Sequence, residues 1–224
     1  MTAYIIDTET TTNDRERAEV IELAYTTLHP NLIADPQTAV LRYKPSRNID
    51  WGALATHHIL PGELHNEPLS TTAVLPSDAR YIIGHNVDFD WEVLGKPPVK
   101  RIDTLALARY LWPDLDSHKL GAVVYYLMGA NPATKALLRD SHSAGADVNS
   151  CRIILEAVLD ERPHIQSIEA LWAFSEDARI PRIMTFGKYK GQNVADVDRG
   201  WVKWYRGQAD TDPYLLEAFR RLGR

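Results

Sequence analysis

The stretch TAYIIDT at residues 2–8 decides the fold, because its apolar run predicts a buried first strand. Two further β-rich runs, residues 20–28 and 39–43, follow it after polar or proline-containing turns. Three strands in such quick succession predict an antiparallel meander at the start of the chain.

The next hundred or so residues are mainly helical in pattern. Residues 81–84 form a short apolar run that predicts one more strand, and a helix is expected from residue 88 to about 94, before Pro97. Apolar residues at helical spacing predict three further helices, at residues 103–111, 119–128 and 142–159. This order indicates an α/β domain with helices packed on a mixed sheet, rather than an all-parallel doubly wound fold.

The sequence changes character near residues 162–180. A short amphipathic helix is expected at residues 167–177, and basic and aromatic residues alternate beyond it. We therefore expect one domain over residues 1–165, a linker helix over residues 166–180 and a small basic and aromatic C-terminal module over residues 181–224.

The C-terminal module admits two interpretations. Trp201 and Trp204 are three residues apart, which is typical of a buried helical face, so they are expected to help build a small core. Lys188 and Lys190 fit equally well a solvated surface or a surface that binds the phosphates of a DNA strand.

The bulk composition is that of an ordinary globular protein, with 45% hydrophobic and 25% charged residues. The sequence has no run of about 18 apolar residues and no basic and apolar leader, so we expect a soluble, cytoplasmic protein with no membrane partner. The single cysteine, Cys151, excludes an internal disulfide. The net charge of -5 is unlike that of domains that bind nucleic acid through Lys and Arg, unless divalent metal neutralises part of it.

Asp7-Thr8-Glu9 stands at the end of the first predicted strand. Because side chains alternate along a strand, Asp7 and Glu9 are expected on one face and Thr8 on the other. Two carboxylates on one face of a rigid strand can hold a metal ion, although an Asp-x-Glu triplet alone is more often solvated.

A second acidic motif, HNVDFD at residues 85–90, follows the fourth predicted strand and opens a helix. Asp88 is expected to favour the helix N-terminus through the helix dipole, whereas Asp90 faces a different side. His85 and Asn86 are residue types that commonly bond the backbone of turns.

His142 lies five residues before Asp147, at the predicted start of the longest helix. The residues between them are small, which leaves room for both side chains to reach one cavity. On its own, such a pair is more often a helix cap and a solvated residue.

Together, in this order, the three motifs resemble those of the DEDDh branch of the DnaQ-like exonucleases. That family has Asp-x-Glu on its first strand, a His-Asn-x-x-Phe-Asp string and a His-x4-Asp motif. The matching residues are Asp7 and Glu9, Asp90, and His142 and Asp147. The segments at residues 103–109 and 117–120 also resemble the family, so the resemblance covers residues 1 to about 160. It implies a ribonuclease H-like mixed sheet, in which three antiparallel strands precede parallel strands, flanked by helices.

The C-terminal residues resemble the extension of the family's exodeoxyribonuclease X branch, from FGKYKG at residues 186–191 onward. Family members often continue the first motif with Gly and an apolar residue that wedges the terminal base, whereas this chain has TTN at residues 11–13. THHI at residues 56–59 resembles the family's His-x-Ile segment near the terminal nucleotide, which points to His57.

The resemblance implies a metal-dependent 3′-to-5′ exodeoxyribonuclease that releases nucleoside 5′-monophosphates from single- or double-stranded DNA ends. It implies two Mg²⁺ ions, replaceable by Mn²⁺, with His142 as general base because its ordinary pKa is about 6.5. The implied metal ligands, also catalytic, are Asp7, Glu9, Asp90 and Asp147. The implied substrate contacts are Thr8, Thr10, His57 and Asn86.

Two alternatives stay open. An RNA 3′ exonuclease or oligoribonuclease shares these motifs, because RNA and DNA differ at the site only by the 2′-hydroxyl. A catalytically inactive nucleic-acid-binding module on the same fold is less favoured, because all five key positions are filled. The sequence does not distinguish a monomer from a homodimer.

Overall fold

The computed structural model describes residues 2–140 and 143–224. The chain divides into two compact units, Met1–Ser175 and Glu176–Arg224. Within the described residues, no helix is both long enough and apolar enough to cross a membrane.

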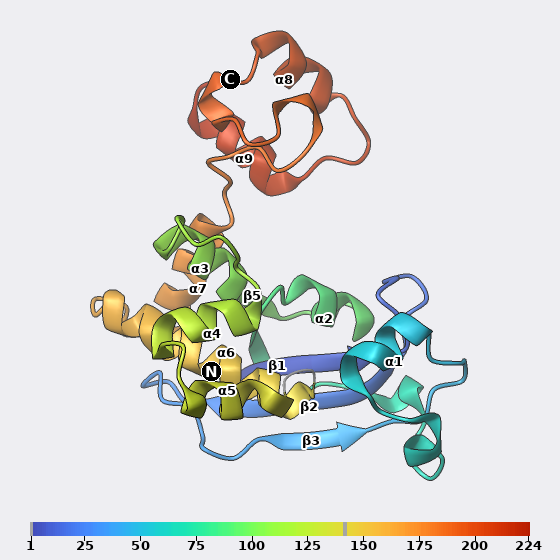
Figure 1. Ribbon diagram of the computed structural model, residues 1–224. Helices are drawn as coiled ribbons and strands as arrows, with labels where there is room; N and C mark the ends of the chain where they lie inside the picture. The colour runs from blue at the N-terminus through green and yellow to red at the C-terminus, as the bar shows by residue number, and fades with distance from the viewer. Residues whose placement is uncertain (1, 141–142) are drawn as a thin grey trace. The chain divides into compact units, whose positions relative to one another are not determined.

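The first unit is built on a five-stranded sheet with the strand order β3-β2-β1-β4-β5 (Figure 1). The strands are β1 (Thr2–Thr10), β2 (Val20–Leu28), β3 (Ala39–Arg42), β4 (Ala79–Gly84) and β5 (Lys100–Asp103). β2 pairs antiparallel with β1 and β3, whereas β4 pairs parallel with β1 and β5. The predicted mixed sheet, with an antiparallel meander followed by parallel strands, is confirmed.

Seven α-helices surround the sheet in the described part of this unit. They are α1 (Trp51–His57), α2 (Asp88–Val93), α3 (Thr104–Leu111), α4 (Leu120–Met128), α5 (Pro132–Leu137), α6 (Ala144–Glu161) and α7 (Ile168–Ala178). Short 3₁₀ turns are η1 (Pro61–Leu64), η2 (Ser70–Thr72) and η3 (Leu138–Asp140). The last three residues of α7 belong to the second unit.

Strand β1 lies at the centre of the sheet and is covered on both faces. Tyr4 and Ile6 form a buried cluster with Ile82 of β4, against which Trp91 of α2 packs. The opposite face of the strand is covered by α6, which packs on β1 and β2. Each such buried aliphatic side chain stabilises the fold by about 1.5–3 kcal/mol. The alternation of β1 thus sends Ile5, Asp7 and Glu9 toward α6.

The second unit has its own core. It contains α8 (Arg199–Arg206) and α9 (Pro213–Arg221), with the 3₁₀ turns η4 (Gly187–Tyr189) and η5 (Val194–Asp196). Phe219, Tyr205 and Met184 belong to its buried cluster.

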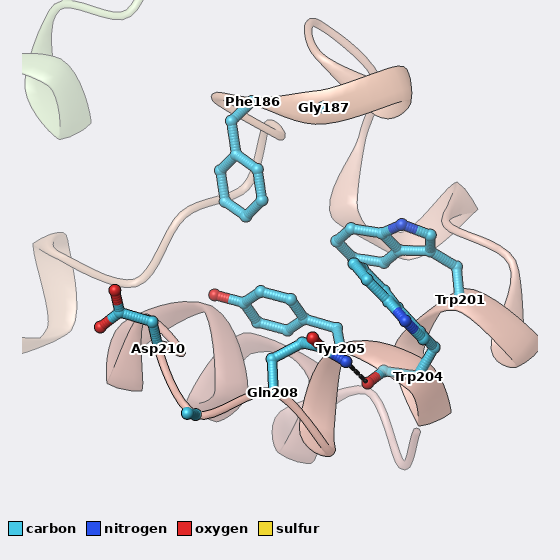
Figure 2. A pocket seen from close by; sticks show the side chains of 8 residues that line it. Phe186, Gly187, Trp201, Trp204, Tyr205, Gln208 and Asp210 are labelled. Atoms are coloured by element: carbon cyan, nitrogen blue, oxygen red, sulfur yellow. Dashed lines mark hydrogen bonds between the residues drawn. The ribbon is translucent and has the colours of Figure 1, made fainter.

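The two tryptophans of α8 differ in their surroundings (Figure 2). Trp201 stacks on Tyr205, with ring centres 5.1 Å apart and an interplanar angle of 6°. Trp204 lies at the edge of the inner face and is 56% exposed. The expectation that both tryptophans build the core is therefore wrong for Trp204.

Candidate active site

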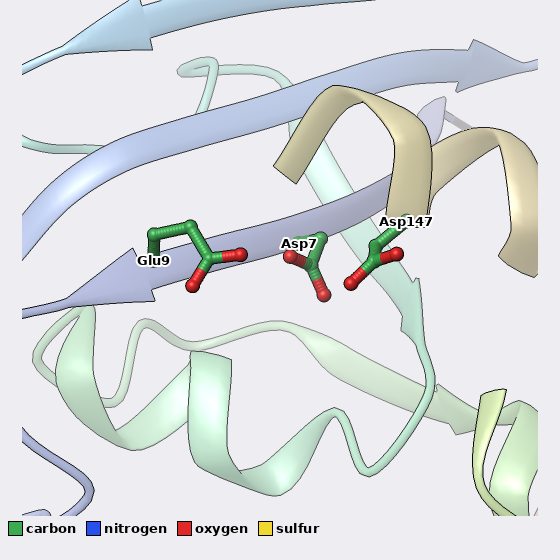
Figure 3. Close-up of side chains that lie close together, drawn as sticks. All are labelled: Asp7, Glu9 and Asp147. Atoms are coloured by element: carbon green, nitrogen blue, oxygen red, sulfur yellow. The ribbon is translucent and has the colours of Figure 1, made fainter. Parts of the chain in front are cut away.

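Three carboxylates converge from two elements far apart in the sequence (Figure 3). Asp7 and Glu9 project from β1, and Asp147 lies in the first turn of α6. One ligand oxygen from each lies within 4.8 Å of the other two. Figure 3 shows Asp7 between the other two carboxylates. We call these three residues the carboxylate cluster.

Burial and mutual repulsion raise the pKa values of the carboxylate cluster. Burial raises the pKa of Asp7 well above its ordinary value, and the charges of Asp90, Asp147 and Glu9 raise it further. Burial also raises the pKa of Glu9 to about 8, with Asp147 as the strongest charged neighbour. The neighbouring charges that shift these two pKa values are all carboxylates. A cation at this position would favour the ionised forms of these acids.

Asp88 and Asp90 have different surroundings. Asp88 accepts a hydrogen bond from Arg101 Nη1 at 2.7 Å and lies in the first turn of α2, where an acid favours the helix dipole. Asp90 is 4% exposed and accepts a 2.7 Å hydrogen bond from Thr8 Oγ1. Burial raises the pKa of Asp90 to about 7, although the Thr8 bond lowers it. Among the neighbouring charges, that of Asp90 raises the pKa of Asp7 most.

A buried acid that the sequence motifs did not reveal, Glu22 of β2, holds the start of α6. It is 2% exposed and lies opposite Glu9 in the pairing of β1 with β2. Its carboxylate accepts hydrogen bonds from the backbone N of Ala144 at 3.0 Å and from Arg42 Nε at 2.9 Å. In the sequence, Glu22 is marked only as an acid within a mainly apolar strand, and Ala144, which it holds, is distant in the sequence.

The same helix end is capped by its own first residues. Ser143 Oγ accepts a hydrogen bond from the backbone N of Ala146 at 3.4 Å, which satisfies one free N–H of the first turn. Because Asp147 lies one residue further along, the cap and Glu22 together fix where its carboxylate lies.

The two predicted threonine contacts have hydroxyls that are bonded within the chain. Thr8 Oγ1 donates to Asp90, on the α2 side of the sheet, and Thr10 Oγ1 donates to the backbone O of Thr12 at 2.9 Å. Both residues are buried. Their side chains therefore position neighbouring residues of the site.

His57 ends α1 and is 6% exposed. Its Nδ1 accepts a hydrogen bond from the backbone N of Ile59 at 2.9 Å. Its Nε2 faces the backbone of Thr10 without a well-formed hydrogen bond in the described part of the chain. Burial lowers the pKa of His57, so the ring is neutral near pH 7.

The remaining predicted residues lie in turns. Asn86 is exposed with a φ of 71°, a conformation that asparagine tolerates, and its backbone N donates to Asp103 Oδ1 at 2.9 Å. His85 bonds Thr104 Oγ1 and the backbone O of His118. The predicted general base, His142, lies outside the described residues.

The exonuclease family model, RNase T, matches residues 4–155. The chain belongs to this exonuclease family. It is 30% identical over 218 residues to Exodeoxyribonuclease 10 of Escherichia coli strain K12, covering 92% of this chain and 91% of that protein. The predicted resemblance to DnaQ-like exonucleases is thereby confirmed.

Solved structures of exonucleases share the fold. Exonuclease X in complex with 5′-overhanging duplex DNA has a TM-score of 0.56 at 22% identity, covering 75% of this chain and 99% of that one. Escherichia coli Exonuclease I in complex with a dA16 oligonucleotide has a TM-score of 0.56 at 18% identity, covering 81% and 44%. As a member of this family, the chain is a nucleic-acid hydrolase that uses divalent metal ions.

Proposed function

We propose that this exonuclease removes nucleoside 5′-monophosphates from the 3′ ends of DNA, using two Mg²⁺ ions that Mn²⁺ can replace. The observation that carries the proposal is the carboxylate cluster, whose oxygens lie within 4.8 Å of one another on two rigid elements. DNA as substrate is supported by the name of the 30% identical relative and by the DNA-bound structure of a protein with the same fold.

The donor set fits magnesium. Mg²⁺ prefers oxygen ligands, and the described cluster consists of carboxylates alone. The four acids that would hold the ions are Asp7, Glu9, Asp90 and Asp147. Bound ions neutralise charge on the phosphate and lower the pKa of the attacking water.

The protein contributes by holding these acids in place. Asp7 lies between Glu9 and Asp147, so it would hold the metal together with both of these acids. The Thr8 hydroxyl fixes the orientation of the Asp90 carboxylate. Such prepositioned ligands need no rearrangement when substrate binds.

The general base in this proposal is His142, which precedes the α6 helix that carries Asp147. An imidazole with a pKa of about 6.5 accepts a proton from water near neutral pH. Thr8 and Thr10 each donate their hydroxyl proton within the chain, so beside their backbone groups they could offer the substrate only a hydroxyl oxygen as acceptor. Asn86 has an exposed side chain that can take that role, whereas the Nε2 atom of His57 is buried in this structure.

The test is degradation of DNA labelled at one end. With Mg²⁺, a 5′-labelled strand should shorten stepwise, whereas a 3′-labelled strand should release its label at once as a mononucleotide. Asp7→Asn should abolish both reactions. Asp88→Asn is the matched control, because Asp88 is bonded to Arg101 and lies outside the cluster, and it should remain active.

The outcomes separate the alternatives. Stepwise shortening of the 3′-labelled strand would reverse the polarity, and full activity of Asp7→Asn would reject the site. Faster degradation of a matched RNA strand would make the protein a ribonuclease that uses the same chemistry.

A further inference from the structure

Helix α8 of the second unit presents two chemically different surfaces. Trp201, Trp204 and Tyr205 recur at helical spacing on one side. Arg199, Lys203 and Arg206 recur at i, i+4 and i+7, which places them along another side. Each side lines a separate cavity.

The aromatic side lines a cavity of about 480 Å³ (Figure 2). That volume is within the range of about 300–1,000 Å³ for small-molecule sites. Trp204 is 56% exposed and Phe186 is 39% exposed, so both rings offer faces that the core does not use. The rings of Phe186 and Tyr205 contact each other in the wall of this cavity, with centres 5.8 Å apart.

The polar edge of this aromatic cavity accepts hydrogen bonds. Gln208 Nε2 donates to the backbone O of Trp204 at 3.1 Å, which leaves the Gln208 amide oxygen as an acceptor. Asp210 adds a carboxylate to the same lining. Exposed aromatic faces with hydrogen-bond acceptors beside them suit a flat ring that carries an amino group.

The basic side lines a smaller cavity of about 270 Å³, to which Arg224 adds another guanidinium. Among the ion pairs of residues 2–140 and 143–224, none involves Arg199 or Lys203. Arg206 donates a hydrogen bond to the backbone O of Arg224, and Arg224 donates one to the backbone O of Val197. Residues 176–224 carry ten Lys and Arg against seven Asp and Glu, in a chain whose net charge is -5. This unit therefore carries a net positive charge within an acidic protein, and that charge complements phosphate.

We propose that α8 forms a second binding site for single-stranded DNA, outside the catalytic centre, with an unstacked base in the aromatic cavity and a phosphate of the same strand on Lys203, the sequence neighbour of Trp204. Base stacking on aromatic rings combined with a basic track is how proteins hold single strands without reading their sequence. The site extends the proposed function, because it lies wholly in residues 176–224 and uses no residue of the carboxylate cluster.

A cationic ligand is the alternative occupant of the aromatic cavity. Aromatic faces attract cations, and Asp210 would add to that attraction. The basic residues on the same helix oppose it, because Lys203 and Arg206 are sequence neighbours of Trp204 and Tyr205 and would repel a second positive charge. The observed charge therefore favours nucleic acid.

The test is fluorescence anisotropy of labelled oligodeoxycytidylate with the full chain carrying Asp7→Asn, which keeps the probe intact. Trp204→Ala should raise Kd about tenfold, and Trp204→Phe should restore most of the affinity, because phenylalanine still stacks. Ile183→Ala removes an apolar side chain of the same unit that is 48% exposed and outside the cavity, and it should change Kd less than twofold.

Salt dependence tests the basic side. Lys203→Ala should lower the slope of log Kd against log salt by about 1, as expected for one phosphate contact. Arg220→Ala, a change at an exposed arginine paired with Glu217, should leave the slope unchanged.

Base preference tests the acceptor edge. Oligothymidylate should bind more weakly than oligodeoxycytidylate, because thymine has no exocyclic amino group. Asp210→Ala should reduce that difference.

Equal Kd values for Trp204→Ala and its parent would overturn the proposal. The proposal would also be overturned if Trp204→Ala weakened the binding of oligolysine and left the binding of DNA unchanged, because the cavity would then be a cation site. Hydrolysis of a small p-nitrophenyl ester of thymidine 5′-monophosphate should depend on Asp7 and not on Trp204. If Asp7→Asn loses this reaction and still binds DNA in a way that depends on Trp204, the catalytic site and the α8 site are tested separately.

Discussion

Replacing Glu9 by glutamine should stabilise the metal-free protein at alkaline pH while abolishing its activity. The pKa of Glu9 rises from an ordinary 4.5 to about 8 on folding, mainly through burial. A raised carboxyl pKa means that the folded state holds the proton more tightly. Glu9 therefore does not lower the free energy of unfolding below about pH 4.5, and it lowers this free energy increasingly as the pH rises toward 8.

The size of the effect follows from the shift. At about 1.36 kcal/mol per pKa unit, the charged Glu9 costs the folded state up to about 4 kcal/mol at pH 8. Glutamine has the same shape and no charge, so it avoids this cost. If glutamine recovers half of this free energy, the Tm should rise by roughly 4–8 °C for a domain of this size.

The assay is thermal and urea unfolding at pH 5, 6.5 and 8, followed by far-UV circular dichroism with EDTA present. Glu9→Gln should gain stability relative to the unmutated chain as the pH rises. Glu16→Gln, at an exposed glutamate, is the control and should show no such trend. If Glu9→Gln were no more stable than Glu16→Gln at pH 8, or gained its advantage toward acid pH, the electrostatic account of the cluster would be wrong.

Three other changes test the remaining parts of the site. Mg²⁺ should raise the Tm more at pH 8 than at pH 5, because the ion binds the ionised acids, and calorimetry should show that Asp7→Asn loses this stabilisation. Glu22→Gln should lower the free energy of unfolding by about 1.5–3 kcal/mol and lower kcat more than it raises KM, because α6 loses a charged hydrogen bond. Glu63→Gln, at the exposed partner of Arg42, is the control and should change neither. Thr8→Val should raise the pKa of Asp90 further above its ordinary value and move the acid limb of the pH–rate profile upward, whereas Thr56→Val, at a hydroxyl bonded only within α1, should not.

The central strands were predictable because their apolar runs are long. β1 and β2 each contain buried residues on both faces, which is the pattern that the sequence displays most clearly. β5 was missed because it has only four residues, begins with Lys100 and Arg101 and lies at the sheet edge. α1 was missed because its first residue, Trp51, is 84% exposed and the helix has only seven residues.

The sequence predicted those parts of the site that depend only on the geometry of one strand. Strand alternation alone places Asp7 and Glu9 on one face, and the structure shows them together. Nothing local to the sequence brings Asp147 to them, because that depends on how α6 packs across β1 and β2. The same holds for Glu22, whose importance comes from Ala144, a residue 122 positions away.

The most direct test of the central claim is calorimetric titration of Mn²⁺ into the full chain at pH 7.5. The unmutated protein and Asp88→Asn should bind Mn²⁺ and release protons, because binding ionises acids whose pKa values are raised. Asp7→Asn should lose this binding. Equal Mn²⁺ affinity and proton release in Asp7→Asn would contradict the assignment of the carboxylate cluster as the metal site.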